Sequence, residues 1–485
     1  MPRAGQVKPV DDERLTDRIA VGVLTSMFPP ALVDEVIEET GRVEQRHRLL
    51  PARVVVYFTL AMCLWADEGY EEVARLLVGG LGKMARWRGS WRVPTTGALT
   101  QARARLGSGV LKALFERVAS PTSTPGAVGS WWRGLRLVAI DGTVFDVPDT
   151  ASNQVRFGRP ASGRGDGLGA FPQARVVALA ECGTHAVIGA QVGACTIGEA
   201  TLARGLFTLL GEGMLLLADR GFGGYDLWQG AAATGAQLCW RTKANAVLPV
   251  THALPDGSYL SFLRPPRGNP GGPVAVRVLE YTLSHPSRGA DEAPVRLLTT
   301  LLDPRQAPAT ELAALYAQRW EQESAFDELK THQRGAGRVL RSKSPEMVIQ
   351  EIYAHLLVYY AIRVLVNRGA EPIDLDPDRV SFIRSLRVAR RQVTDQAAFP
   401  PLNTWPPPSA KPPARSCTGS TRDGCESTPE SSNARCPNGP LKHAQHRNPA
   451  RPQAPPSDTI TITGPSRTER RKRPVISAKR SSDPN

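Results

Sequence analysis

The chain has 485 residues, of which 41% are hydrophobic and 22% charged, and this balance is typical of a globular protein with two or three domains. Its net charge of +14 favours a polyanionic partner such as nucleic acid, although more than half of that excess lies after residue 400. The seven cysteines show no CxxC pair and no zinc spacing, and neither a signal peptide nor a membrane span is predicted. These features exclude a secreted disulfide scaffold and favour a cytoplasmic protein with reduced thiols.

The first quarter of the chain has a helical pattern. Residues 12–120 carry apolar residues at helical spacing, which predicts an all-α domain. Thr95 or Thr96 can cap its last helical group. Arg103 and Arg105 lie in this group, in the segment QARARLG. They either contact DNA phosphates or form a solvated helix face, and the sequence favours neither alternative.

The pattern changes after a linker rich in Pro, Gly, Ser and Thr at residues 120–130. Residues 131–370 alternate short apolar strands with helices, which indicates an α/β domain with a mixed central sheet. Within it, residues 247–303 are predicted to form a β-rich insertion. The expected strands of the core are residues 135–140, 174–180, 185–192, 214–218 and 237–243, and the expected helices are 198–210, 225–234 and 345–367.

Two of the expected strands end at an aspartate. LRLVAI ends at Asp141, and MLLLA ends at Asp219. Ligands of open α/β sheets gather at the carboxyl ends of the strands, so neighbouring strands would bring these carboxylates together. Two such charges repel unless a cation neutralises them, and oxygen ligands without His or Cys suit Mg²⁺ or Mn²⁺. For the Asp-Gly pair at 141–142 taken alone, a simple turn is the alternative.

The segment YAQRWEQESAFDELK is predicted to be one helix, since it has no Gly or Pro and consists mostly of helix-favouring residues. At about 100° per residue, four of its polar side chains fall within an arc of roughly 60°: Tyr316, Arg319, Glu323 and Lys330. An acid flanked by Arg and Lys suits a site for phosphate and a metal ion, whereas an exposed face of i,i+4 ion pairs is the alternative. Asp327 also lies near the arc, so the helix alone does not select one acid.

Together these segments resemble a DDE transposase of the IS4 family of bacterial insertion sequences. IDGT around Asp141 resembles the first-aspartate motif of the family, and LADRGF around Asp219 resembles the second. YAQRWEQESAFDELK reproduces the Y-(2)-R-(3)-E-(6)-K pattern, and WRTKAN and RSKSPEMVIQEIYAHLL resemble flanking segments. LPARVVVYFTLAMCLW and TQARARLG resemble the N-terminal domain that is commonly fused to this family. The resemblance covers roughly residues 12–370.

The resemblance implies an RNase H-like catalytic core, interrupted by a β-rich insertion and preceded by a helical DNA-binding domain. It assigns Asp141, Asp219 and Glu323 as the catalytic residues and as the ligands of two Mg²⁺ or Mn²⁺ ions. It implies cleavage at the inverted-repeat ends of an insertion sequence, excision through a hairpin intermediate and joining of the freed 3′-hydroxyls to target DNA.

The resemblance also implies the contacts with DNA. It places Tyr316, Arg319 and Lys330 near the phosphate backbone of the transposon end, with Arg241 and Lys243 as further contacts. The implied partners are inverted-repeat DNA, target DNA and a second copy of the chain in the DNA complex. The implied location is cytoplasmic, at the nucleoid, without a membrane.

Two other functions stay open at this stage. One is a nuclease of the same fold that cuts DNA without joining it, because the same acids serve both reactions. The other is an inactive DNA-binding relic of a transposase. Residues 399–485 are rich in Pro, poor in apolar residues and basic, and are predicted to form a disordered tail.

Overall fold

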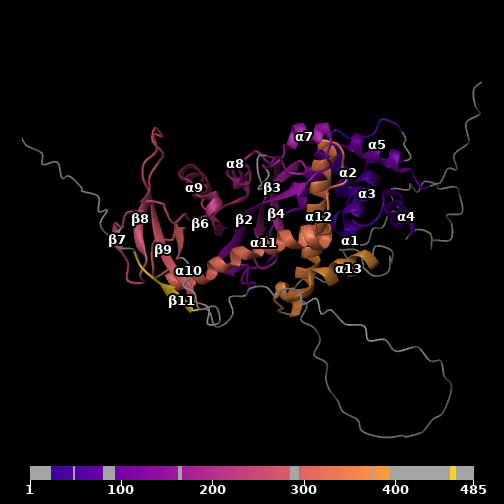
Figure 1. Ribbon diagram of the computed structural model, residues 1–485. Coiled ribbons are helices and arrows are strands. Elements are labelled where there is room, and N and C mark those ends of the chain that lie inside the picture. The colour runs from indigo at the N-terminus through magenta and orange to yellow at the C-terminus, as the bar shows by residue number, and fades with distance from the viewer. Residues whose placement is uncertain are drawn as a thin grey trace, which may run out of the picture. The chain divides into compact units, whose positions relative to one another are not determined.

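A computed structural model describes residues 23–46, 50–79, 93–161, 167–284, 294–373, 375–392 and 459–465 (Figure 1). Its α-helices are α1 (Val23–Met27), α2 (Pro30–Glu39), α3 (Ala52–Leu64), α4 (Tyr70–Gly79), α5 (Thr96–Leu106), α6 (Gly109–Val118), α7 (Ala151–Phe157), α8 (Glu199–Arg204), α9 (Tyr225–Ala232), α10 (Ala309–Tyr316), α11 (Trp320–Asp327), α12 (Pro345–Ala370) and α13 (Phe382–Gln392). Its strands are β1 (Trp131–Trp132), β2 (Leu135–Asp146), β3 (Gln173–Glu181), β4 (Val187–Ala194), β5 (Met214–Ala218), β6 (Gln237–Arg241), β7 (His252–Ala253), β8 (Tyr259–Leu263), β9 (Val274–Ser284), β10 (Val295–Thr299) and β11 (Thr459–Ile462).

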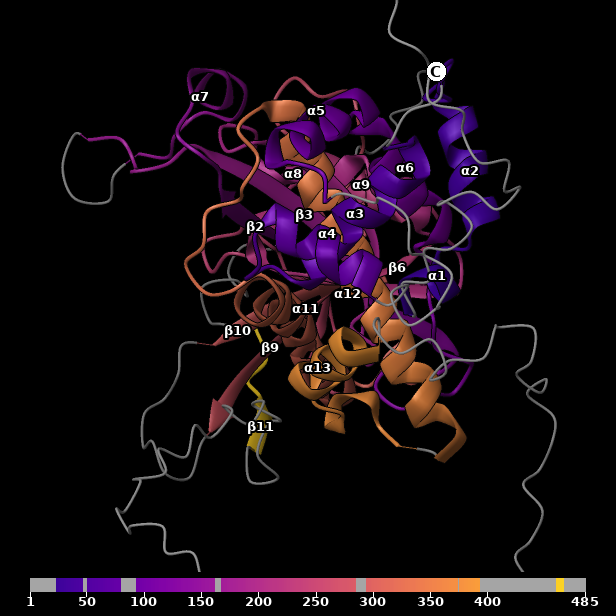
Figure 2. The ribbon, with the colours of Figure 1, turned by 90° about the vertical axis from the view of Figure 1, so that its right-hand side faces the viewer.

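Helices α1 to α6 form the N-terminal region, as the helical pattern predicts. Nearly every residue of α3 is buried, because α4, α5 and α12 surround it. Figure 2 shows the N-terminal helices gathered around α12, with which they share one hydrophobic core. Thr95 caps α5, since its side chain accepts a hydrogen bond from the Ala98 amide at 3.3 Å. The first residues of the expected domain, up to 22, lie outside the described residues.

Arg103 is fully buried and does not face solvent. Its guanidinium donates hydrogen bonds to the hydroxyl of Tyr70 (2.5 Å), the amide oxygen of Gln350 (2.9 Å) and the hydroxyl of Ser342 (3.0 Å). These hydrogen bonds connect α5 to α4, to α12 and to the segment before α12. The hypothesis of a phosphate contact is wrong for Arg103, whereas Arg105 is exposed as that hypothesis requires.

The described strands form one mixed sheet, in which the order of the core is β4-β3-β2-β5-β6. β2 pairs antiparallel with β3 and parallel with β5, and β6 continues the parallel part. This arrangement confirms the mixed sheet expected of the core. β2 runs on to Asp146 and does not end at Asp141 as predicted, because Asp141–Asp146 still pairs with residues of β3.

The predicted insertion is rich in strands and extends the same sheet. β10 pairs antiparallel with β6, and β9, β8 and β7 follow outward. The insertion is therefore a continuation of the core sheet, and it lies between the segment that carries Asp219 and the helix that carries Glu323.

Alternate residues of β2 face opposite sides of the sheet. Val138 and Ile140 belong to the core formed with α8 and α9, whereas Leu137 and Ala139 belong to the core formed with α10. Figure 1 shows α8 and α9 on one side of the sheet and α10 and α11 on the other. Residue 141 is thus directed toward the side of α10 and α11, and residue 142 toward the side of α8.

The predicted single helix over 316–330 is divided into segments of different winding. After α10, residues Ala317–Arg319 form a 3₁₀ turn, and after α11, residues Glu328–Gln333 form a π-helix. Buried tertiary partners of Arg319 and Glu328, described below, override the uniform winding that propensity favours.

α12 has 26 residues. Together with the following 3₁₀ turn, it meets the length and composition test for a membrane-spanning helix. However, 89% of its most apolar window is buried inside the protein, as in the core helix of a globular protein. The other described helices do not meet the same length and composition test.

Most of the predicted tail lies outside the described residues. The exception is 459–465, where β11 pairs antiparallel with β9. The expectation of disorder is wrong for this stretch, because the alternating sequence TITI packs Ile460 and Ile462 against the core beside α10. The basic run at 467–473 lies outside the described residues.

Candidate active site

Asp141, within β2, and Asp219, directly after β5, lie at the same step of adjacent strands. Ile140 of β2 and Ala218 of β5 are register partners in a parallel pair, and each aspartate follows its partner directly. The Asp141 carboxylate accepts a hydrogen bond from the Gly142 amide at 2.8 Å. The structure therefore brings together the two aspartates that the strand ends predicted.

Glu323 reaches this edge from α11, and Arg319 links it to Asp141. Nη2 of Arg319 donates to Oε1 of Glu323 at 2.9 Å, and Nη1 lies 3.7 Å from Oδ2 of Asp141. The Arg319 side chain is only 5% exposed, whereas that of Glu323 is 42% exposed. A single buried guanidinium thus lies between two of the three predicted catalytic acids.

Asp141 is in an environment that disfavours its charged form. Its pKa is raised to about 6, chiefly because burial removes water from the carboxylate. The neighbouring charges of Glu323 and Glu199 add to this rise, and the Gly142 amide and Arg319 oppose it. A divalent cation at this position would favour the charged form.

The residues present fit a divalent cation. The donors are carboxylate oxygens alone, which Mg²⁺ and Mn²⁺ prefer. Oδ1 of Asp219 is buried and accepts no hydrogen bond from the described residues, and Nη1 of Arg241 lies 4.0 Å away. A buried carboxylate oxygen without a donor needs a compensating positive charge. For the other two acids, Asp141 and Glu323, the Arg319 guanidinium supplies such a charge.

Two further residues of the predicted set surround these acids. Tyr316 is buried, and its hydroxyl donates to the carbonyl oxygen of Ala218 at 3.1 Å, directly before Asp219. Lys330 donates from Nζ to the hydroxyl of Thr143 at 3.1 Å, on the strand that carries Asp141. The four residues that the helical arc selected therefore all lie beside the middle of β2, around Asp141, or beside the end of β5.

Arg241 and Lys243 lie on the far side of Asp219, at the end of β6. Arg241 is half-buried and Lys243 is exposed. Both line a pocket of about 240 Å³ that also includes Arg264 of the insertion. Arg241 and Lys243 could therefore contact a phosphate on the side of Asp219 that is opposite to Lys330.

An open hollow of about 390 Å³ lies between β2 and α11, and Asp141, Glu323, Asp327 and Lys330 line it. Asp327 is mostly exposed and accepts a hydrogen bond from the hydroxyl of Thr331 at 2.6 Å. It shares the hollow with Glu323 but, among the described residues, has no ion pair with the Arg319 that joins Glu323 to Asp141, so the geometry favours Glu323 as the third acid.

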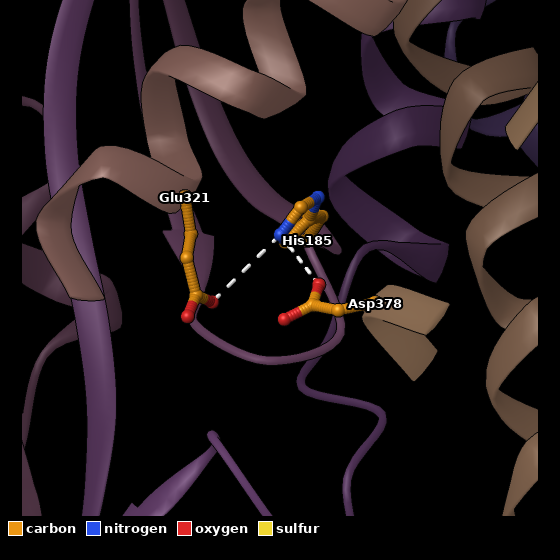
Figure 3. A group of neighbouring side chains, drawn as sticks. All are labelled: His185, Glu321 and Asp378. Carbon is orange, nitrogen blue, oxygen red and sulfur yellow. Dashed lines mark ion pairs between the residues drawn. The ribbon is translucent and has the colours of Figure 1, made fainter. Parts of the chain in front are cut away.

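A second cluster lies behind α11 and joins His185, Glu321 and Asp378 (Figure 3). Their ligand atoms lie within 4.8 Å of one another, which makes the group a candidate cation cluster. Nδ1 of His185 lies 2.7 Å from a guanidinium nitrogen of Arg363, which can only donate, so the neutral ring carries its proton on Nε2. Nε2 itself lies 2.9 Å from Oδ1 of Asp378. This protonation suits a hydrogen-bond network better than a metal ligand.

The network behind α11 includes the ion pair of Glu328 and Arg363. Burial alone would raise the pKa of Glu328, but Arg363 and the hydrogen bonds to the carboxylate hold it at about 2. Tyr359 also donates to this carboxylate, at 2.8 Å. The pair anchors the π-helix that follows α11, so it fixes the position of the segment that carries Glu323.

One acid beside the site is absent from the sequence predictions. Glu199 is the first residue of α8, and its carboxyl group lies against Gly142 and near Gly221. The sequence shows Glu199 as an acid at the start of the helix that follows the hairpin, between the two aspartate motifs. Nothing in that pattern predicts the contact with Gly142, because the contact depends on how α8 packs on the sheet.

Two family descriptions match this chain. The family "Insertion element 4 transposase N-terminal" matches residues 18–116, and the family "Transposase DDE domain" matches residues 132–361. Transposase InsG for insertion sequence element IS4, from Escherichia coli strain K12, is 30% identical over 392 residues, covering 78% of this chain and 85% of that relative.

Among solved structures, a cryo-EM structure of the piggyBac transposase synaptic complex with hairpin DNA aligns with 77% of this chain and 79% of its own. The identity is 10% and the TM-score is 0.42. The family assignment rests on the sequence matches, which cover both the helical region and the domain that contains Asp141, Asp219 and Glu323. The chain belongs to the IS4 family of DDE transposases, whose catalytic domain implies the use of a divalent metal.

Proposed function

We propose that this transposase cuts DNA at the inverted-repeat ends of its insertion sequence and joins the freed ends to target DNA by two-metal phosphoryl transfer. Asp141, Asp219 and Glu323 are the proposed ligands of two Mg²⁺ or Mn²⁺ ions. The observation that carries the proposal is the register of Ile140 with Ala218, since it sets the two aspartates side by side at the edge that α11 covers.

Bound divalent ions would activate the attacking oxygen and stabilise the leaving oxygen of an in-line displacement at phosphorus. The contribution of the chain is to hold its three carboxylates at one edge and to offset the repulsion between them. Arg319 does this in the structure by bridging Asp141 and Glu323. Tyr316 fixes the backbone just before Asp219 through its bond to Ala218.

DNA phosphates would lie along the basic side chains on both flanks of the acids. Lys330 lines the hollow on one flank, and Arg241 and Lys243 line the pocket on the other. Burial and the nearby Arg334 lower the pKa of Lys330, and a bound phosphate would favour its charged form. We expect two copies of the chain to act together on the paired transposon ends.

A two-substrate assay tests this function. Wild type, Asp219→Asn and the matched control Asp327→Asn would receive intact inverted-repeat DNA or a pre-cut end with a free 3′-hydroxyl, each with Mg²⁺ and target DNA. Wild type and Asp327→Asn should cut the first and join the second, and Asp219→Asn should do neither. Cutting without joining would identify a nuclease, and inactivity of every protein would identify a DNA-binding relic.

A further inference from the structure

The carboxyl group of Glu199 occupies the space that a side chain at position 142 would fill. A Cβ atom added to Gly142 would lie 2.5 Å from both Cδ and Oε1 of Glu199. A Cβ atom added to Gly221 would lie 3.8 Å from Oε2 of the same side chain. Glu199 therefore reaches into a cradle formed by the two glycines that follow Asp141 and Asp219 in their motifs.

Glu199 and Glu323 approach the same step of β2 from opposite faces of the sheet. Asp141 is directed toward α11, which carries Glu323, whereas position 142 is directed toward α8, which carries Glu199. Because position 142 lacks a side chain, the Glu199 carboxylate comes within contact of the strand itself. A larger residue there would exclude it from the catalytic edge.

Glu199 is half-buried and, among the described residues, has no hydrogen-bond or ion-pair partner. The three other acids each have a cationic neighbour: Asp141 and Glu323 have Arg319, and Asp219 has Arg241. The Glu199 carboxylate is close enough to Asp141 to disfavour the charged form of that acid. A carboxylate so placed and without a basic partner is unfavourable, unless a cation joins it.

We propose that Glu199 is a fourth metal-binding carboxylate of the catalytic centre. Two divalent ions, Arg319 and Arg241 bring six positive charges to this edge, and three carboxylates bring only three negative charges. A fourth carboxylate reduces that excess, and its oxygens are of the type that Mg²⁺ and Mn²⁺ bind. This inference rests on the proposed function, because it assigns Glu199 to the same ions.

The competing role for Glu199 is structural, because an acid in the first turn of a helix is stabilised by the helix dipole. The two roles predict opposite effects on the metal-free protein. Glu199→Gln should leave its melting temperature in EDTA unchanged or raise it, since repulsion at the edge is relieved. A helix-dipole role would lower it. Asp226→Asn removes a first-turn acid from α9 and is the matched control.

Titration of the metal-free full chain with Mn²⁺, followed by the EPR signal of the free ion, tests the inference without DNA. Glu199→Gln should weaken the tightest binding by about tenfold, the size expected when a group that tunes a metal site is lost. Gly142→Ala should cause a similar loss, because its methyl group displaces the Glu199 carboxylate. Asp226→Asn should bind Mn²⁺ like wild type.

The outcome for Asp219→Asn separates this inference from the proposed function. If Asp219→Asn loses Mn²⁺ binding while Glu199→Gln binds like wild type, the fourth carboxylate is overturned and the three-acid site stands. If both variants bind like wild type, both proposals fail. A fall in the EDTA melting temperature of Glu199→Gln, with unchanged Mn²⁺ affinity, assigns the residue to helix stability and also overturns the inference.

Discussion

The hydroxyl of Tyr316 donates a hydrogen bond to the carbonyl oxygen of Ala218 at 3.1 Å, so α10 holds the backbone that immediately precedes Asp219. Tyr316 is buried, and burial raises its pKa well above the usual range, so the hydroxyl keeps its proton. This contact connects α10 directly to the end of β5.

Tyr316→Phe removes that hydrogen bond and keeps the ring. We expect a loss of about 1 kcal/mol in the free energy of unfolding, the usual contribution of one buried hydrogen bond. The rate of DNA cleavage should fall while the affinity for inverted-repeat DNA stays the same, since the residue positions Asp219. Fluorescence anisotropy measures the affinity for DNA, and a single-turnover assay measures the rate of cleavage. A loss of affinity without a slower rate would instead indicate a phosphate contact.

Asp141→Asn should stabilise the metal-free protein while abolishing cleavage. The Asp141 carboxyl has a folded pKa of about 6 and an ordinary value of 3.8, so its charge destabilises the fold above pH 6. That cost, at most about 3 kcal/mol, is relieved as the pH falls from 6 toward 3.8. Thermal unfolding in EDTA should therefore show a higher melting temperature for the variant at pH 8 and a smaller difference at pH 5. A lower melting temperature at pH 8 would contradict this account.

Glu328→Gln should destabilise the fold, because it leaves the buried Arg363 without its carboxylate. The pKa of Glu328 is about 2 in the fold against an ordinary 4.5, so its stabilisation is fully present above pH 4.5 and is lost as the pH falls toward 2. The difference corresponds to about 3 kcal/mol. Urea unfolding should show this gap at pH 7 and a smaller one at pH 3. An equal gap at both values would mean that the ion pair is not its source.

Arg103→Ala should destabilise the protein by at least about 3 kcal/mol, because it leaves Tyr70, Gln350 and Ser342 with lost hydrogen bonds in the core. Arg105→Ala removes an exposed arginine from the same helix and should change the free energy of unfolding by less than about 0.5 kcal/mol. Urea unfolding compares the two directly. If Arg103→Ala unfolds like wild type but binds DNA more weakly, the structural role of Arg103 is wrong.

The sequence was informative where a local pattern and the fold agree. MLLLA predicted β5 with its observed bounds and placed Asp219 at its end, because a short apolar run of this kind forms a buried parallel strand. The helical arc grouped Glu323 with three polar residues that contact β5, Asp141 or Thr143 in the structure, although the segment winds in three different ways.

What the sequence could not supply depends on contacts between distant parts of the chain. β2 extends to Asp146 because β3 pairs with it, and β11 forms because β9 offers an edge. Arg103 is buried because partners from α4 and α12 surround it, and its own segment carries no sign of them. The position of Glu199 likewise follows from the packing of α8 against the glycine after Asp141.

The central claim is that Asp141, Asp219 and Glu323 together hold divalent cations. Replacing Mg²⁺ with Fe²⁺ and generating hydroxyl radicals with ascorbate and peroxide would cut the polypeptide next to bound iron. Three groups of cuts are expected, near residues 141, 219 and 323, which excess Mg²⁺ suppresses and Asp219→Asn abolishes. Cuts confined to other parts of the chain, or a pattern unchanged in Asp219→Asn, would contradict it.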